Sequence, residues 1–176
     1  AGLTTFAIGT DTGGSVRMPA SLCGITGFKP TYGMVSRRGV LDLSWTMDHV
    51  GPMARSAKDC LDVMSIISGY DSKDKYSINL DNNKFFVDKS FERKKIKIGL
   101  PKSYFFDDID EEIKSSVLDA VKKLSNLGYQ IEEIDLPFVE EGRSLNVGVL
   151  IPEALTIHKD YLKPVSYTHL TLPTTP

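Results

Sequence analysis

The residues best suited to chemistry lie in a glycine-rich segment near the start of the chain, Gly9-Thr-Asp-Thr-Gly-Gly-Ser-Val-Arg17. In this segment a serine, Ser15, follows Gly13 and Gly14. Because glycines put no side chain in the way, successive backbone N–H groups can point into one concavity and stabilise an oxyanion. The segment therefore predicts acyl transfer, in which the Ser15 hydroxyl attacks a carbonyl and the N–H groups from Thr12 to Ser15 face the oxyanion.

Two familiar motifs do not fit this segment. Gly9 and Gly14 have the glycine spacing of a phosphate-binding loop, but Ser15-Val16 stands where that loop has lysine followed by serine or threonine. A nucleophile elbow, Gly-x-Ser-x-Gly, is excluded because Arg17 occupies the position of the final glycine. A plain glycine-rich turn with a capping serine stays open beside the catalytic interpretation.

Regular structure is predicted on both sides of the segment. The apolar run Leu3–Gly9 suits a buried strand or the end of a helix. A helix is expected from Ser56, a potential N-cap with Asp59 at the capping-box position, to Gly69. Its predicted apolar face consists of Leu61, Val63, Met64 and Ile67. The polar stretch 71–95 is typical of a surface connection.

The second half of the chain has the pattern of a βαβ unit. A strand is predicted at Lys95–Leu100, an amphipathic helix at Asp110–Leu127 with Gly128 as its C-cap, and a second strand at Tyr129–Leu136. The two strands should be parallel, because a helical crossover joins them. A last helix is expected at Pro152–Leu162. The order of elements predicts an α/β fold.

Charge and composition argue against several function classes. The net charge of −2, from 21 Lys+Arg and 23 Asp+Glu, leaves no bulk positive field for a phosphate backbone, so no direct nucleic-acid binding is expected. No apolar run approaches the ~20 residues that span a bilayer, so no membrane span is expected. Cys23 and Cys60 form neither a CxxC pair nor a metal quartet, which predicts buried free thiols in a reducing, cytoplasmic compartment.

An ordered series of short motifs resembles the amidase signature family. The series is Gly9–Ala20, Cys23-Gly24, Gly27-Phe-Lys-Pro-Thr31, Gly33-x-Val-Ser-x-x-Gly39 and Asp48-His-Val-Gly-Pro-Met53. The match is dense over residues 1 to 70 and collinear to about 163. The resemblance implies part of a three-layer α/β/α fold with a mixed central sheet. It also implies a serine-dependent amidase that needs no metal and no cofactor.

The resemblance also assigns roles by position. Ser15 matches the nucleophile of the family, and Thr12, Gly13 and Gly14 match its oxyanion-hole loop. Thr10, Asp11 and Arg17 match residues that surround the active site in the family. Arg17 is expected to hold the loop in place by binding a carboxylate. The other members of the family's triad, a serine in a cis peptide and a lysine, are expected upstream of Ala1. Without them Ser15 should be nearly inert. Lys29, His49 and His158 are expected to be structural.

Two branches of the family, and one function of another class, stay open. Leu43–Pro52 and Glu153-Ala-x-x-x-His158 favour a stand-alone hydrolase, which converts a small-molecule carboxamide to carboxylate and ammonia. A homodimer is one assembly open to such a hydrolase. The alternative is the A subunit of the tRNA-dependent Glu/Asp amidotransferase, a carbon-nitrogen ligase system with glutamine as amido donor, working with B and C subunits. A non-catalytic α/β interaction domain is the alternative outside enzymes.

The two ends of the chain are expected to be atypical. Residues 1–164 are predicted to be a partial amidase domain, truncated at both ends. The uncharged stretch 165–176 is interpreted as read-through of a sequencing adapter, because Val165–Thr174 is the translation of a transposase adapter. A genuine Thr/Pro-rich linker is the alternative for this stretch.

Overall fold

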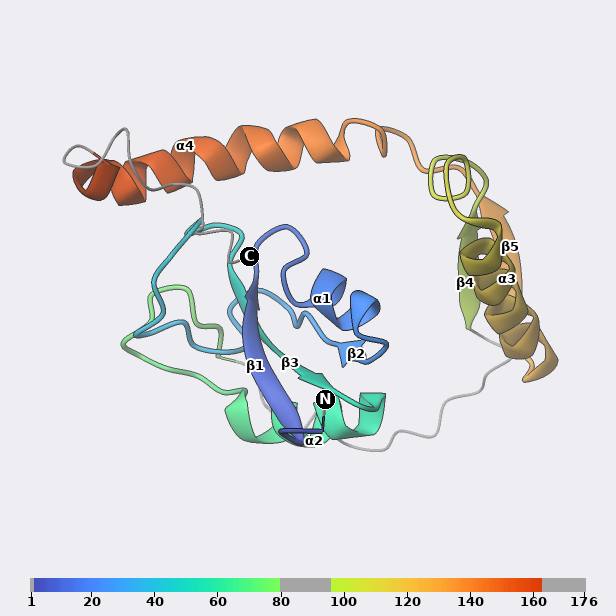
Figure 1. Ribbon diagram of the computed structural model, residues 1–176, viewed down its shortest axis with the longest axis horizontal. Helices are drawn as coiled ribbons and strands as arrows, with labels where there is room; N and C mark the ends of the chain where they lie inside the picture. Colours follow the sequence, from blue (N-terminus) through green and yellow to red (C-terminus); the bar gives the residue numbers. More distant parts are fainter. Residues whose placement is uncertain (1, 80–95, 163–176) are drawn as a thin grey trace, which may run out of the picture. The chain divides into compact units, whose positions relative to one another are not determined.

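A computed structural model describes residues 2–79 and 96–162 of the chain (Figure 1). The chain forms two compact units, one made of residues 1–87 and 146–176 and the other of residues 88–145. Both units combine strands and helices, which confirms the α/β class. The predicted surface connection is described as turns from 71 to 79, and the rest of it lies outside the described residues, as does the segment 165–176.

The first unit contains a three-stranded antiparallel sheet in the order β1-β3-β2. Its strands are β1 (Phe6–Asp11), β2 (Thr26–Gly27) and β3 (His49–Ala54). Asp11 at the end of β1 pairs with His49 at the start of β3. The chain then passes through the glycine-rich segment into the short helix α1 (Arg17–Leu22). The sheet therefore places the Ser15 loop directly at the end of a paired strand.

The predicted strand near the start of the chain exists, but it is not buried. Phe6 and Ile8 are each 45% exposed among the described residues, although both lie in β1. Among the described residues, β1 packs mainly against β3, and no helix makes an extensive contact with it. An apolar run alone does not show what will cover it.

Helix α2 (Ala57–Ile67) begins where the capping signal places it. Ser56 Oγ accepts a hydrogen bond of 3.1 Å from the backbone N–H of Asp59, as an N-cap does. Val63 and Met64 are buried as predicted, and Met64 packs in a small core with Val35 and Val50. The prediction for Leu61 was wrong, because the helical turn exposes it and puts Cys60 in the core instead.

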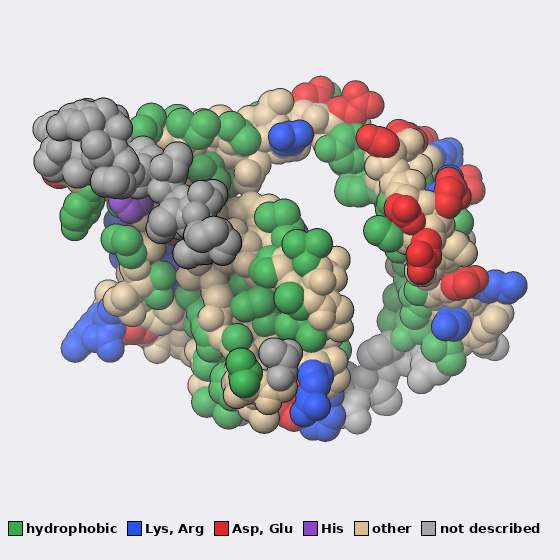
Figure 2. All heavy atoms as spheres, in the orientation of Figure 1, with side chains coloured by type: hydrophobic (Ala, Val, Ile, Leu, Met, Phe, Trp, Pro, Cys, Tyr) green, Lys and Arg blue, Asp and Glu red, His purple; other side chains and the backbone are tan. Residues whose placement is uncertain are grey.

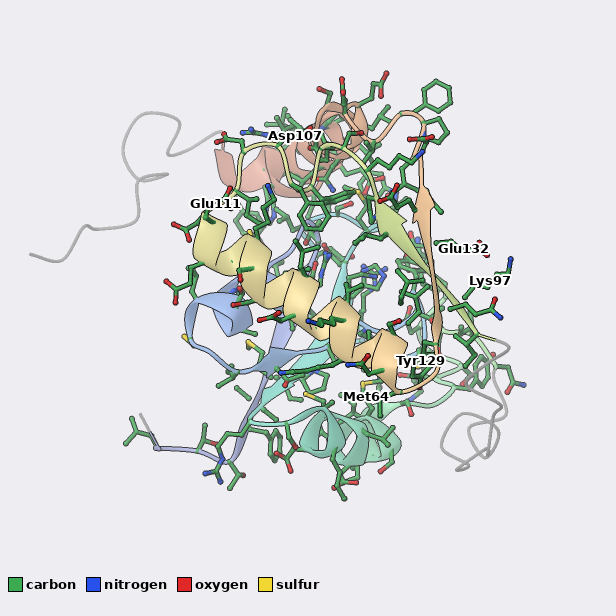
Figure 3. All side chains as sticks on the ribbon, turned by 90° about the vertical axis from the view of Figure 1, so that its right-hand side faces the viewer. Met64, Lys97, Asp107, Glu111, Tyr129 and Glu132 are labelled. Atoms are coloured by element: carbon green, nitrogen blue, oxygen red, sulfur yellow. The ribbon has the colours of Figure 1, made fainter. Side chains whose placement is uncertain are left out.

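The second unit is the predicted βαβ element. β4 (Lys97–Pro101) and β5 (Gln130–Ile134) are parallel and are joined through α3 (Glu111–Asn126), which confirms the prediction. Lys97 of β4 and Glu132 of β5 lie side by side (Figure 3), with 2.7 Å between Nζ and Oε1. Gly128 follows the C-cap with a φ of 96°, a conformation that favours glycine.

Helix α4 (Gly142–Leu162) is ten residues longer at its start than predicted. Pro152 was expected to begin the helix but lies inside it. The first half was missed because residues 144–152 carry no charge, so no polar face marks a helical period. None of the helices described here has the length and apolar character needed to cross a membrane.

Candidate active site

Asp11 organises the loop that carries Ser15. Its side chain is fully buried and accepts hydrogen bonds from the Gly14 N–H at 2.7 Å and from the Arg17 N–H at 3.4 Å. The Arg17 guanidinium binds both carboxylate oxygens, with Nε 2.9 Å from Oδ2 and Nη2 3.0 Å from Oδ1. The loop between Asp11 and Arg17 is therefore closed on itself by one carboxylate, and Ser15 lies exposed on its outside.

The electrostatics of Asp11 match this geometry. Burial acts to raise the pKa of the Asp11 carboxyl, but the hydrogen bond and charge of Arg17, with the N–H groups of Gly14 and Arg17, outweigh it. The pKa is therefore held below its ordinary value, and Asp11 is ionised at neutral pH.

Both glycines before Ser15 lie where a side chain would not fit easily. Gly14 has a φ of 135°, and a Cβ there would come within 3.1 Å of Met18 Cγ. A Cβ on Gly13 would lie 3.1 Å from Oδ1 of Asn146, which belongs to α4. The close approach of α4 explains why residue 13 is a glycine.

The backbone donors of the loop fall into two kinds. The Gly14 N–H is directed to Asp11. Within residues 2–79 and 96–162, no hydrogen-bond partner is found for the N–H groups of Thr12, Gly13 and Ser15. An oxyanion bound at this loop would therefore meet Thr12, Gly13 and Ser15 first, whereas Gly14 would have to share its N–H with Asp11. Thr10, the remaining predicted support residue, is an exposed residue of β1 opposite Val50.

A buried aspartate that the sequence interpretation did not select lies next to the loop. Asp48 Oδ1 accepts a hydrogen bond of 2.6 Å from Thr12 Oγ1. Its Oδ2 accepts from the N–H groups of Leu43 at 2.7 Å and Ser44 at 3.0 Å, and lies 3.8 Å from Arg37 Nη1. Asp48 stands in the motif Asp48–Met53, but only its contacts show that it holds Thr12.

Helix α4 contributes a second buried carboxylate, that of Glu153. Its Oε2 accepts from Ser44 Oγ at 2.5 Å and from the Thr46 N–H at 3.2 Å, and its Oε1 accepts from Thr46 Oγ1 at 2.7 Å. Burial acts to raise the pKa of Glu153, but the hydrogen bonds from Ser44 and Thr46 hold it below its ordinary value. The segments 43–52 and 153–158, which the sequence analysis singled out, therefore contact each other.

One sequence signal could have identified Glu153. It is the only Asp, Glu, Lys or Arg between Arg143 and Lys159. A single charge in an otherwise uncharged stretch of helix indicates a side chain with a fixed partner.

No described side chain supplies a base to Ser15, since the Ser15 hydroxyl has no hydrogen-bond partner in the part of the chain that the structure describes. Lys29 Nζ lies 3.2 Å from His49 Nε2, and His49 Nδ1 lies 2.6 Å from the carbonyl oxygen of Met47. Burial and the charge of Lys29 lower the pKa of His49, so this imidazole is neutral. His158 packs against Tyr161.

The cysteines differ from each other in environment. Both are free, and Cys60 is buried as predicted, but Cys23 is exposed because it follows α1 at the surface. Among residues 2–79 and 96–162, no cluster of three or more His, Cys, Asp or Glu side chains is placed to hold a metal ion.

Comparison with known proteins gives a consistent result. The family model described as Amidase matches residues 1–173. The chain is 46% identical over 135 residues to the A subunit of the glutamyl-tRNA(Gln) amidotransferase of Agathobacter rectalis, covering 77% of this chain and 27% of that protein. The chain therefore spans less than a third of the length of these curated relatives.

Solved structures agree with the sequence relatives. The crystal structure of the A subunit of the glutamyl-tRNA(Gln) amidotransferase from Thermotoga maritima has a TM-score of 0.79 and 32% identity, over 94% of this chain and 38% of that chain. The allophanate hydrolase of Kluyveromyces lactis has a TM-score of 0.80 and 30% identity, over 93% of this chain and 26% of that chain.

Proposed function

The chain belongs to the amidase family, and from this premise we propose that it carries the nucleophile of an enzyme that cleaves the carbon-nitrogen bond of a carboxamide. The observation that carries the proposal is the loop geometry. Ser15 is exposed at the end of β1, on a loop clamped by Asp11 and Arg17, beside N–H groups that have no partner among the described residues. That arrangement suits attack on a carbonyl and stabilisation of the resulting oxyanion.

The proposed reaction has two halves. The Ser15 Oγ bonds to the carbonyl carbon and loses its proton to a base, while the N–H groups of Thr12, Gly13 and Ser15 stabilise the oxyanion. The tetrahedral species then collapses, the carbon-nitrogen bond breaks, and the nitrogen leaves as ammonia after taking up a proton. Water hydrolyses the ester on Ser15, which gives the carboxylate and restores the hydroxyl. In this proposal the base is a lysine that acts through a serine in a cis peptide, and the family resemblance leads us to expect both upstream of Ala1.

A second candidate concerns the identity of the amide. Curated relatives of 44–46% identity are named as the A subunit of glutamyl-tRNA(Gln) amidotransferase, which favours glutamine as the amide and B and C subunits as partners. The segments 43–52 and 153–158 favour a stand-alone hydrolase of a small amide. Both candidates use the same Ser15 chemistry, so the proposed carbon-nitrogen cleavage does not depend on the choice.

We also propose that residues 1–164 are an internal part of a longer amidase domain and that 165–176 are not native. The short span of the curated relatives covered by this chain supports the first statement. Sequencing the gene from genomic DNA tests both. A native coding sequence for 165–176, or an upstream region without a serine and a lysine at the family positions, contradicts them.

Covalent labelling tests the function directly. The full-length protein is treated with a fluorophosphonate, and mass spectrometry locates the modified residue. Ser15 should be modified, and Ser15→Ala should abolish labelling and lower ammonia release by on the order of 10⁶-fold. Ser21→Ala, which changes an exposed serine of α1, is the matched control and should leave both unchanged.

The outcomes separate the candidates. Ammonia release from small amides by the protein alone supports the hydrolase. Release from glutamine that requires partner subunits and tRNA supports the amidotransferase. If Ser15 of the full-length protein is never modified and no ammonia is released, the proposal is contradicted and a non-catalytic interaction domain is supported.

A further inference from the structure

Two buried carboxylates bind the same short turn, one of them close to it in the sequence and the other more than a hundred residues further on. Asp48 accepts hydrogen bonds from the N–H groups of Leu43 and Ser44. Glu153 accepts hydrogen bonds from the Ser44 hydroxyl and from the N–H and hydroxyl of Thr46. Asp48 is 3% and Glu153 is 9% exposed. We call residues 43–46 the carboxylate-bound turn. Its two hydroxyls and three of its N–H groups donate to charged acceptors, which form stronger hydrogen bonds than neutral ones.

The carboxylate-bound turn is connected to the Ser15 loop. Asp48 uses one oxygen for the turn and the other for Thr12 Oγ1, at 2.6 Å. Thr12 stands three residues before Ser15, and its N–H is one of the proposed oxyanion donors. A displacement of Asp48 would therefore move a donor of the site.

Helix α4 reaches the Ser15 loop at a second point. Asn146 lies seven residues, about two helical turns, before Glu153 and therefore on nearly the same face of α4. Its Oδ1 would be 3.1 Å from a Cβ on Gly13, and its Nδ2 lies 3.6 Å from Met47 Sδ. The hydrogen bonds of Glu153 to Ser44 and Thr46 thus fix the position of α4 relative to Gly13.

One buried arginine, Arg37, partly offsets the negative charges of this arrangement. The Arg37 side chain, 4% exposed, lies 3.8 Å from Asp48 and 3.2 Å from Asp42. Its guanidinium also donates to the Trp45 carbonyl at 2.9 Å, which fixes it against the same turn. Buried carboxylates cost free energy unless they are paired, so this cluster has a defined geometry.

We propose that Glu153 is a positioning residue for the Ser15 loop. It acts by one route through Ser44, Asp48 and Thr12. By a second route it fixes the position of Asn146 of α4 against Gly13. This inference rests on the proposed function for its effect on chemistry. Among the described residues, the hydrogen bonds of the Glu153 carboxylate go to Ser44 and Thr46 and not to Ser15. Its effect is to hold the oxyanion donors in place.

The test uses the full-length protein and the rate of Ser15 modification by a fluorophosphonate. Glu153→Gln keeps the size of the side chain but presents an N–H group where one oxygen accepts from Ser44 or Thr46. We expect labelling to slow by roughly 10-fold in folded protein, less than the ~100-fold that a 1 Å misplacement causes. Thr12→Val, which removes the donor to Asp48, should slow it to a similar extent. Glu140→Gln, the same change at an exposed site before α4, should have no effect.

A double variant distinguishes positioning from general destabilisation. Because Glu153 and Thr12 share the connection through Asp48, the rate loss of Glu153→Gln with Thr12→Val should be smaller than the product of the two single losses. Rate losses that multiply in full, or a Glu153→Gln protein that labels at the wild-type rate despite a lower melting temperature, overturn the proposal. If Glu153→Gln does not fold, Ser44→Ala removes one donor to Glu153 and takes its place in the cycle.

A measurement without catalysis keeps the two proposals separate. Hydrogen exchange of the Gly14 amide, which donates to Asp11, should be faster in Glu153→Gln than in the wild type and unchanged in Glu140→Gln. Unchanged exchange in Glu153→Gln overturns the positioning role. Absence of labelling at Ser15 in the wild type, together with faster exchange in Glu153→Gln, contradicts the proposed function but supports the positioning.

Discussion

Asp11 holds the Ser15 loop through four hydrogen bonds, two of them from the Arg17 guanidinium. Asp11→Asn keeps the shape of the side chain but directs an N–H₂ group toward donors. We expect it to lower the free energy of unfolding by about 2 kcal/mol, because hydrogen bonds to a charged, buried group are lost. Urea denaturation of the full-length protein measures this change.

The partner of Asp11 provides the control. Arg17 has a side chain that is 51% exposed, so water replaces the lost contacts in Arg17→Gln, and the loss should be about 1 kcal/mol. Equal losses for the two variants would show that the buried carboxylate is not the organising group.

The lowered pKa of His49 leads us to expect that the stability of the protein depends on pH. Burial and the neighbouring Lys29 hold the pKa of His49 below its ordinary value in the folded protein, so the unfolded chain binds the proton more readily. The corresponding contribution to stability is complete above the ordinary histidine pKa of about 6.5 and is lost as the pH falls from there through the folded pKa. Melting temperatures from pH 8 to 5 measure it.

His49→Gln is the comparison for this pH dependence, because glutamine keeps a polar side chain but does not titrate. The variant should lose less stability than the wild type between about pH 6.5 and 5. Identical pH profiles for the two proteins would contradict the assignment.

At the scale of the element, the N-cap of α2 gives a local prediction. Ser56→Ala removes the acceptor for the Asp59 N–H and should cost about 1 kcal/mol of unfolding free energy. Ser65→Ala, in the interior of the same helix, removes a hydroxyl that binds the Asp62 carbonyl and should be neutral or slightly stabilising. A Ser56→Ala variant as stable as Ser65→Ala would mean that α2 is held by packing alone.

Elements set by local signals were predicted well. The cap of α2, the acidic start of α3, the glycine after it, and the parallel pairing of β4 and β5 follow from neighbours along the chain. The first half of α4 was missed because a stretch without charge has no amphipathic period.

The candidate site divides in the same way. The Ser15 loop could be predicted because its residues are consecutive in the sequence. Asp48 and Glu153 could not be assigned to it, because the hydrogen bonds join residues 36 positions apart for Thr12 and Asp48, and 109 for Ser44 and Glu153. Only folding brings such pairs together.

At the scale of the whole molecule, the described surface is rich in apolar side chains. Figure 2 shows hydrophobic side chains gathered over the α1 part of the first unit. A cavity of about 350 Å³ between β2 and α2 is also apolar. Its lining residues are Thr26, Phe28, Met34, Ala57, Cys60, Leu61 and Met64. Large exposed apolar patches mark surfaces that another part of a protein covers, and we expect the rest of the proposed amidase domain to cover this cavity.

This expectation gives a prediction for two forms of the protein. Leu61 is 49% exposed and lines the cavity, so Leu61→Asp should hardly change the stability of the 176-residue chain. In the full-length protein the same change would place a charge in an apolar contact and should cost about 3 kcal/mol. Ile66→Asp, on the same helix but 82% exposed and outside the cavity lining, is the matched control and should cost less. Binding of a hydrophobic dye should be strong for the chain and weak for the full-length protein, and equal losses for Leu61→Asp in both forms would show that the cavity faces solvent in both.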